Sequence, residues 1–155
     1  MSMANSNINK KGLVVAVSGG FDPVHVGHVR MINEAKKLAG PLGKLIVILN
    51  NDNWLKAKKG FVFMDEKERK EIMQSLKNVD EVVITNHKKN PTDMSVCDTL
   101  IKIKPNIFAN GGDRTKNNIP ELDLGNEWGM KMAFGVGKGG KVQSSSWLIK
   151  KVKHK

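Results

Sequence analysis

The chain has 155 residues, 39% hydrophobic and 26% charged, which is typical of one globular domain and excludes a disordered or fibrous chain. The excess of 26 basic over 15 acidic side chains gives a formal net charge of +11, which favours an anionic partner without identifying it. No apolar run approaches the roughly 20 residues of a membrane-spanning helix, so no membrane partner is expected. The single cysteine, Cys97, cannot form an internal disulfide, which favours a cytoplasmic location.

The polar residues 1–11 are expected to form a flexible N-terminal tail, and residues 12–152 a single domain. Within this domain, short runs of β-branched and other apolar residues predict strands that are buried on both faces. These strands are expected at residues 13–17, 45–49, 82–84, 107–109 and 132–136.

Apolar residues at helical spacing separate the predicted strands. The helices that they predict lie near residues 29–39, 65–76, 96–103, 122–128 and 148–152. Asp65 and Glu68 fit a capping box at the start of the second of these helices. Residues 50–64 are polar and are expected to form a long loop.

The alternation of strands and helices predicts an α/β fold, a Rossmann-like doubly wound sandwich around a five-stranded parallel sheet. Ligands of such sheets bind at the carboxyl ends of the strands, near the point where the strand order reverses. We therefore expect the functional residues in the loops that follow the strands, at residues 18–28, 50–64, 110–119 and 137–146.

The most informative of these loops follows the first strand and reads SGGFDPVHVGH over residues 18–28. It lacks the third glycine of a dinucleotide-binding fingerprint and the Lys-Ser/Thr of a P-loop. His25 and His28 are three residues apart at the start of a helix, which puts both imidazoles on one side of its first turn. Free backbone N–H groups and the positive end of the helix dipole are expected beside them, so the loop predicts an anion site.

The histidines have two alternatives to anion binding. A lone histidine is most often a hydrogen-bonded structural residue, but a pair that frames Gly27 directly after a strand favours function. A zinc site would need further ligands, and Cys97, His87 and His154 have no recognisable ligand spacing. No metal held by protein ligands is therefore expected.

The segment GFDPVHVGH at residues 20–28 resembles the Gly-x-Phe-Asp-x-x-His-x-Gly-His signature of the cytidylyltransferase-like nucleotidyltransferase superfamily. The resemblance covers about residues 12–152 and extends to glycerol-3-phosphate cytidylyltransferase and heptose 1-phosphate adenylyltransferase. It implies an enzyme that moves a nucleoside monophosphate from a nucleoside triphosphate to a small phosphorylated acceptor and releases pyrophosphate. Because small relatives often pair, it also implies a homodimer.

The resemblance implies catalytic roles for His25, His28, Arg69 and either Lys58 or Lys59. Mg²⁺ is expected as the counter-ion of the triphosphate, held by phosphate oxygens and water. The structural alternatives are a surface salt bridge for Arg69, a turn at residues 112–113 and a helix N-cap for the serines. The residues implied in nucleotide binding are Gly19, Gly20, Phe21, Asp22, Lys59, Gly112, Asp113, Ser144, Ser145 and Ser146.

The sequence leaves CTP and ATP nearly even and slightly favours CTP, so CMP is the group expected to be transferred. Residues 79–83 are closer to the glycerol-phosphate enzymes and favour CTP with a polyol phosphate as acceptor. Residues 111–113 are closer to the adenylyltransferases that act on a heptose 1-phosphate, which supports ATP with a sugar phosphate. A non-catalytic nucleic-acid-binding protein on the same scaffold is a further alternative, which the intact pair of His25 and His28 disfavours.

Overall fold

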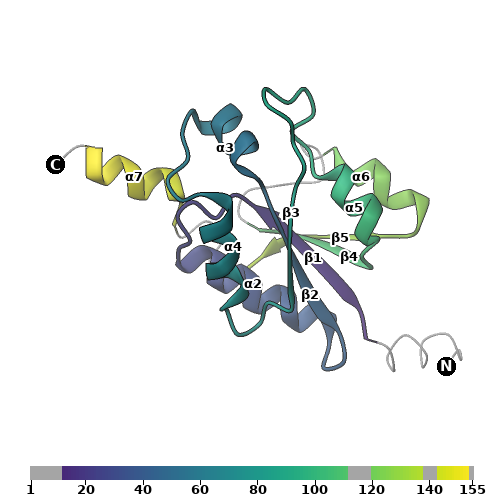
Figure 1. The fold of residues 1–155 in the computed structure, drawn as a ribbon. Coiled ribbons are helices and arrows are strands. Elements are labelled where there is room, and N and C mark those ends of the chain that lie inside the picture. The colour runs from purple at the N-terminus through teal and green to yellow at the C-terminus, as the bar shows by residue number, and fades with distance from the viewer. Residues whose placement is uncertain (1–11, 112–119, 138–142, 154–155) are drawn as a thin grey trace, which may run out of the picture.

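The computed structural model describes residues 12–111, 120–137 and 143–153, and its centre is a five-stranded parallel sheet (Figure 1). The strand order is β3-β2-β1-β4-β5, which confirms the predicted α/β fold. The chain adds β2 and β3 on one side of β1 and then β4 and β5 on its other side, so the strand order reverses between β1 and β4. The strands are β1 (Val14–Gly19), β2 (Lys44–Leu49), β3 (Glu81–Ile84), β4 (Ile107–Gly111) and β5 (Lys131–Val136).

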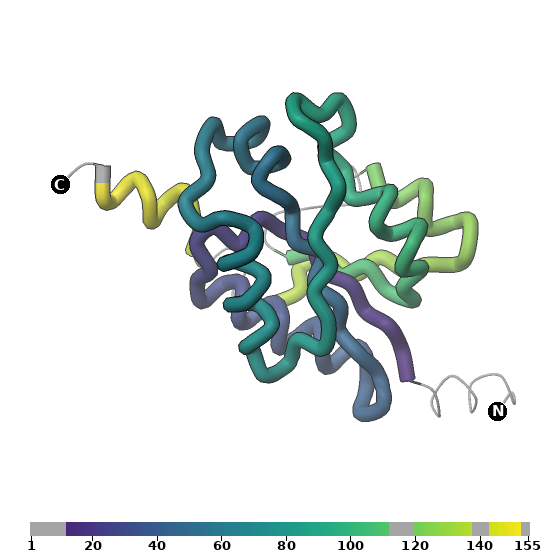
Figure 2. The backbone as a smooth tube through the Cα atoms, viewed as in Figure 1, coloured from purple at the N-terminus to yellow at the C-terminus, as the bar shows by residue number. Residues whose placement is uncertain are grey.

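Helices cover both faces of the sheet, as a doubly wound fold requires. The backbone tube shows α2 and α4 on one face, α5 and α6 on the other, and α7 extending away from the sheet (Figure 2). Among the described residues, no helix combines the length and apolar character needed to cross a bilayer. The helices are α2 (Val26–Ala39), α3 (Asp52–Lys59), α4 (Glu66–Gln74), α5 (Cys97–Ile103), α6 (Glu121–Leu124) with the short 3-10 turn η1 (Gly125–Glu127), and α7 (Ser145–Lys153).

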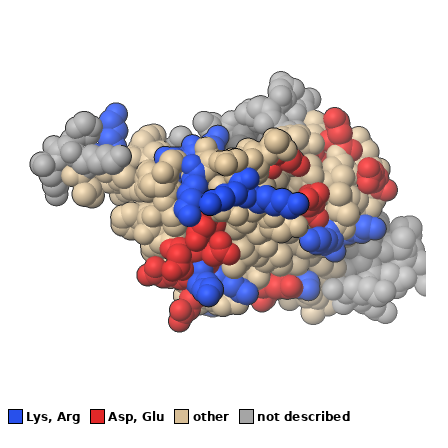
Figure 3. Space-filling view, turned by 45° about the horizontal axis from the view of Figure 1, so that its top comes forward, with Lys and Arg blue, Asp and Glu red and all other residues tan. Residues whose placement is uncertain are grey.

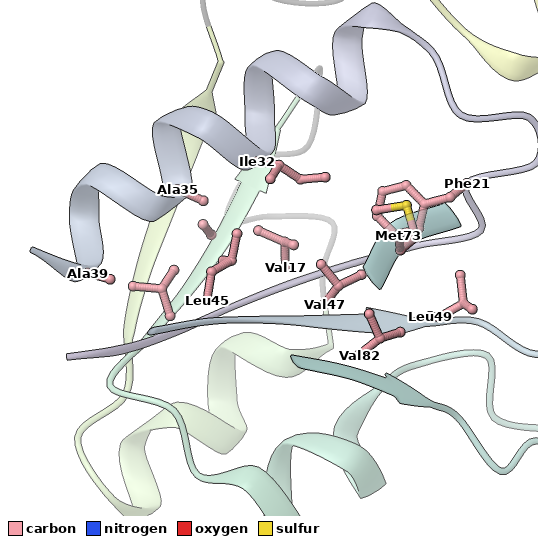
Figure 4. Close-up of a cluster of buried hydrophobic side chains, with 12 residues drawn as sticks. Val17, Phe21, Ile32, Ala35, Ala39, Leu45, Val47, Leu49, Met73 and Val82 are labelled. Carbon is pink, nitrogen blue, oxygen red and sulfur yellow. The ribbon is translucent and has the colours of Figure 1, made fainter. Parts of the chain in front are cut away.

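The strands are apolar on both faces because each face packs against helices. On one side, Val17 and Val47 of the sheet pack with Ile32 of α2 and Met73 of α4 (Figure 4). On the other side, buried side chains of three strands and α5 form a second cluster that includes Ala16, Ile48, Leu100 and Phe108. These two clusters fix the directions in which the loops leave the sheet.

The loops after β1 and β2 begin side by side. The two strands pair over their whole length, from Val14 opposite Lys44 to Gly19 opposite Leu49. Just beyond them, the Asn50 N–H donates to the Gly19 carbonyl oxygen at 2.9 Å. The segments that follow these strands therefore share one edge of the sheet.

The expectation of a loop throughout residues 50–64 is wrong, because residues 52–59 form the helix α3. The Asn51 side chain accepts a hydrogen bond from the Trp54 N–H and caps the start of α3, and Gly60, at a φ of 84°, ends it. Leu55 is the buried residue of this helix, so the sequence carries no apolar repeat there. Asp65 does cap α4 as predicted, since it accepts from the Glu68 N–H at 2.9 Å.

Candidate active site

The two histidines of the first loop form a stacked pair at the start of α2. Their ring centroids are 3.7 Å apart and the ring planes differ by 25°. His25 is the N-cap residue, and its Nδ1 accepts from the Gly27 N–H at 3.1 Å. The Nδ1 of His28 accepts from the His25 N–H at 3.2 Å, so each ring is tied to the backbone through the same nitrogen.

These bonds determine what the pair can offer to a ligand. Because each Nδ1 is an acceptor, the proton of each neutral ring lies on Nε2. The expectation of free N–H groups beside the histidines needs correction, because His25 and Gly27 donate to the imidazoles and the His28 N–H donates to the His25 carbonyl oxygen. The two Nε2–H groups are therefore donors that the imidazoles can present to a ligand.

Gly27 and Phe21 shape the space around the rings. A Cβ atom on Gly27 would lie 2.9 Å from Cε1 of His25, so the stacked arrangement requires glycine there. Phe21 lies in the core with 2% of its surface exposed and meets the His28 ring edge-on, with centroids 4.7 Å apart. The Phe21 ring therefore packs behind the His28 ring in the core, whereas the family resemblance implies that Phe21 binds the nucleotide.

Burial and neighbouring charge keep the pair neutral. Desolvation, together with His25 and Lys59, lowers the pKa of His28 from 6.5 to about 3. Desolvation and the Lys59 ammonium also lower the pKa of His25. At neutral pH the pair is therefore two uncharged hydrogen-bond donors, and it supplies no positive charge.

Of the two candidate lysines, Lys59 faces the histidines. Its side chain is half-buried at the end of α3, whereas Lys58 is exposed. Burial lowers the pKa of Lys59, and the Asp22 carboxylate opposes this effect. Lys59 also lines a hollow of about 310 Å³ with Ser146 and Lys150. The described residues that line this hollow include no Asp or Glu.

The carboxylate of the first loop serves the structure of the site. Asp22 is fully buried, and its two oxygens accept the N–H groups of Phe63 and Met64, each at 2.7 Å. It thereby holds the segment between α3 and α4 against the first loop. Among the described residues, no group of three His, Cys, Asp or Glu side chains is placed to hold a metal ion.

Arg69 is fully buried beneath these loops, and it is neither exposed to a ligand nor part of a surface salt bridge. Its guanidinium donates to the carbonyl oxygens of Gly20 at 2.8 Å, Asn50 at 2.6 Å and Met64 at 2.8 Å. The remaining nitrogen pairs with Asp52 at 2.7 Å. Arg69 thus joins the loop after β1, the loop after β2 and the approach to α4.

The glycine before Phe21 allows α3 to approach the first loop. A Cβ atom on Gly20 would lie 2.9 Å from Leu55 Cδ2 and 3.6 Å from Trp54 Cζ3. One on Gly19 would meet the Phe21 ring at 3.1 Å. Both glycines therefore serve close packing, which leaves the loop backbone near α3.

The three serines have separate positions at the start of α7. The Ser144 hydroxyl accepts from the Trp147 N–H and caps the helix. The Ser145 hydroxyl donates to the Pro23 carbonyl oxygen at 2.8 Å, which attaches α7 to the histidine loop. Ser146 is exposed and lines the same hollow as Lys59. Gly112 and Asp113 lie outside the described residues.

The surface charge follows this arrangement. When the top of Figure 1, where α3 lies, is turned forward, Lys and Arg side chains form a band across the surface (Figure 3). Of the lysines, Lys59 acts electrostatically on both histidines, so a cation adjoins the two neutral donors, which suits a ligand with several negative charges.

Replacing Arg69 tests its role as the joint between the loops. We expect Arg69→Met to lower the free energy of unfolding by about 3 kcal/mol or more, because the partly exposed Asp52 carboxylate and the three carbonyl oxygens lose the buried guanidinium that donates to them. Lys67→Met, an exposed change on the same helix, should stay within about 0.5 kcal/mol. Urea denaturation of both variants measures this, and equal stabilities would contradict the assignment.

The neutral state of His28 predicts a pH dependence of stability. Because its pKa is about 3 in the folded protein and 6.5 ordinarily, the unfolded chain binds the extra proton between these values. The free energy of unfolding should therefore fall as the pH is lowered through this window, by up to about 1.4 kcal/mol per pH unit from this group. His28→Gln should have a shallower slope in urea titrations between pH 4 and 7 (about the span of the window), and an unchanged slope would refute the neutral assignment.

Comparisons with known proteins agree with the fold and the first loop. The chain is 38% identical over 108 residues to an FAD synthase of Methanothermobacter marburgensis, a match that spans 70% of this chain and 63% of that protein. An FAD synthase of Methanobrevibacter smithii is 32% identical over 90% of both chains. The solved structure of a lipopolysaccharide core biosynthesis protein from Thermoplasma volcanium covers 80% of this chain and 94% of its own, with 27% identity and a TM-score of 0.62.

A family model supports the same assignment. The model described as cytidylyltransferase-like matches residues 16–134, which span the histidine loop, the whole of β2, β3 and β4, and parts of β1 and β5. This confirms the resemblance inferred from residues 20–28. The chain belongs to the cytidylyltransferase-like family.

Proposed function

We propose that the protein is a nucleotidyltransferase that joins the AMP part of ATP to a small phosphorylated acceptor. The observation that carries this proposal is the stacked pair of His25 and His28, held by Nδ1 so that two Nε2–H donors lie near the Lys59 ammonium. Such a group of donors fits the oxygens of a triphosphate.

The proposed reaction needs no general base. The second pKa of a phosphate monoester is about 6, so the acceptor is already largely a dianion at neutral pH. One of its oxygens forms a bond to the α-phosphorus, the bond from that phosphorus to the bridging oxygen breaks, and pyrophosphate leaves with the electron pair. Catalysis then consists of positioning the two anions and stabilising the negative charge on the reacting phosphates.

The residues divide this work in our proposal. The imidazole Nε2–H groups of His25 and His28 donate to phosphate oxygens, and Lys59 supplies the positive charge. The hydroxyl of Ser146, which lines the same hollow as Lys59, hydrogen-bonds to the outer phosphates. Mg²⁺ would arrive with the nucleotide, since the nearest loop carboxylate, Asp22, is already bonded to two backbone N–H groups.

Two observations favour ATP over CTP. The relatives named FAD synthase make a product that contains an AMP unit, which ATP supplies. The stretch 79–83, which favoured CTP in the sequence, lies at the start of β3, where Asp80 accepts the Leu45 N–H at 2.7 Å and pairs with Lys36. Asp80 lies just before β3, at the end of the strand away from the ligand edge, and serves to hold β2 and α2 together.

The acceptor that the relatives support best is FMN, whose ribityl phosphate would receive the AMP. A sugar phosphate is the second candidate, because the structurally similar Thermoplasma volcanium protein is described as acting in lipopolysaccharide core biosynthesis. Both acceptors are phosphate monoesters and both would use the same phosphate site.

Pyrophosphate release tests the proposed function. We expect magnesium-dependent release from ATP with FMN or a sugar phosphate, slower release from CTP, and a loss of at least about a hundredfold in His28→Ala. Circular dichroism of the variant would confirm that its fold is intact. If no pyrophosphate is released from ATP or CTP with any acceptor, and the protein retains RNA or DNA in a salt-sensitive way, the non-catalytic alternative is supported instead.

The two adjacent lysines provide a matched test of the site. Lys59→Met should lower kcat/KM by about a hundredfold, since the ammonium lies beside the neutral histidines, whereas Lys58→Met should stay within about threefold. Both variants remove one positive charge from the same helix, so a difference between them reports on position. Equal losses would show that only the overall charge of α3 matters.

A further inference from the structure

Lys59 has surroundings that suit a nucleophile as well as a phosphate-binding cation. Its side chain is half-buried at the end of α3, and this burial lowers the pKa of its amine. A lower pKa enlarges the fraction of the side chain that is an uncharged amine at neutral pH. The uncharged amine is the form of lysine that attacks a carbonyl carbon.

The amine of Lys59 is not tied to a carboxylate in the part of the chain that the structure describes. None of the ion pairs found there includes Lys59. The Asp22 carboxylate lies within electrostatic range, but its two oxygens already accept the N–H groups of Phe63 and Met64. The amine is therefore available to a molecule that enters the hollow beside it.

The groups around Lys59 suit a molecule in which a phosphate adjoins a short apolar part. Ser146 and Lys150 line the hollow of about 310 Å³ and supply a hydroxyl and an ammonium. Phe61 and Ile149 line the same hollow with apolar side chains. The two imidazoles of the first loop, whose Nε2–H groups are donors, are also within electrostatic range of Lys59. A phosphate held by these donors leaves the rest of its molecule beside the amine.

An acyl phosphate has this composition, since its carbonyl carbon is joined through one oxygen to a phosphate. We infer that Lys59 is a modification site, at which acyl phosphates transfer their acyl group to the side-chain nitrogen. This inference rests on the phosphate site of the proposed function, although it requires no turnover.

The transfer needs no further reactant. The lone pair of the uncharged Nζ forms a bond to the carbonyl carbon, and the bond from that carbon to the bridging oxygen breaks. The phosphate leaves with the electron pair and takes the proton that the nitrogen loses. The product is an uncharged amide, which a half-buried position favours over an ammonium.

Acylation removes the cation that acts on both histidines. The imidazoles are themselves uncharged, so the phosphate site keeps their two donors and loses this positive charge. A triphosphate is then bound and stabilised less well. The modification therefore acts as an off switch for the proposed reaction.

Labelling with acetyl phosphate, followed by peptide mass spectrometry, tests the site with Lys58 as an internal control. Lys58 precedes Lys59 on the same helix and is exposed. We expect Lys59 to be acetylated at least about tenfold faster, because the bound phosphate places the carbonyl carbon beside its amine. Pyrophosphate competes for the same donors and should remove most of this difference. Equal rates at the two lysines, or a Lys59 rate that pyrophosphate does not change, would overturn the inference.

A reagent without a phosphate separates positioning from simple reactivity. Lys150→Met should slow the labelling of Lys59 by acetyl phosphate about fivefold, and labelling by acetic anhydride should stay nearly the same. Lys151→Met, the same exchange at an exposed residue that does not line the hollow, is the matched control and should change neither rate. If acetic anhydride prefers Lys59 over Lys58 as strongly as acetyl phosphate does, phosphate binding has no part in the reaction and the inference is wrong.

Pyrophosphate release after labelling keeps the two proposals distinguishable. Release from ATP should fall in proportion to the acetylated fraction of Lys59, and full turnover by the acetylated protein would refute the switch. Acetyl phosphate should leave the rate of Lys59→Arg as it was, because a guanidinium keeps its proton at neutral pH. Selective labelling of Lys59 without release in any sample would retain the modification site and refute the proposed function. Release together with equal labelling of Lys58 and Lys59 would do the reverse.

Discussion

The active site depends on one constraint: both imidazoles of the first loop are fixed through Nδ1 by backbone N–H groups of the same turn. These two hydrogen bonds fix the tautomer and the orientation of each ring. The position of the His25 ring in turn requires glycine at residue 27, because a Cβ atom there would lie against it. It also explains why the pair stays neutral, since a protonated ring would place N–H against N–H. The positive charge that a triphosphate needs must then come from lysine.

The remaining loops are organised around this turn by buried charges. Arg69 joins the carbonyl groups of three segments from below, and Asp22 binds two backbone N–H groups from the next loop. Neither side chain has a surface on which a ligand could rest, although the family signature includes Asp22. A signature residue can therefore serve the geometry of a site without touching its substrate.

The sequence predicted the sheet because apolar runs identify buried strands. The spacing of His25 and His28 also predicted that the two imidazoles lie together, as they do, and the binding of an anion there stays a prediction. The sequence did not predict α3, since Leu55 alone is buried and the capping Asn51 and Gly60 resemble loop residues. Nor could it predict the burial of Arg69 or choose Lys59 over Lys58, because both depend on how α3 and α4 pack against the loop after β1.

The protonation state of the histidine pair tests the account most directly. Long-range 1H–15N correlation spectra of the imidazole nitrogens distinguish the two neutral tautomers from each other and from the charged ring. The account predicts that His25 and His28 both carry their proton on Nε2 at neutral pH and that His28 remains uncharged well below its ordinary pKa of 6.5. A proton on Nδ1 of either ring, or a His28 ring already charged at mildly acidic pH, would contradict it.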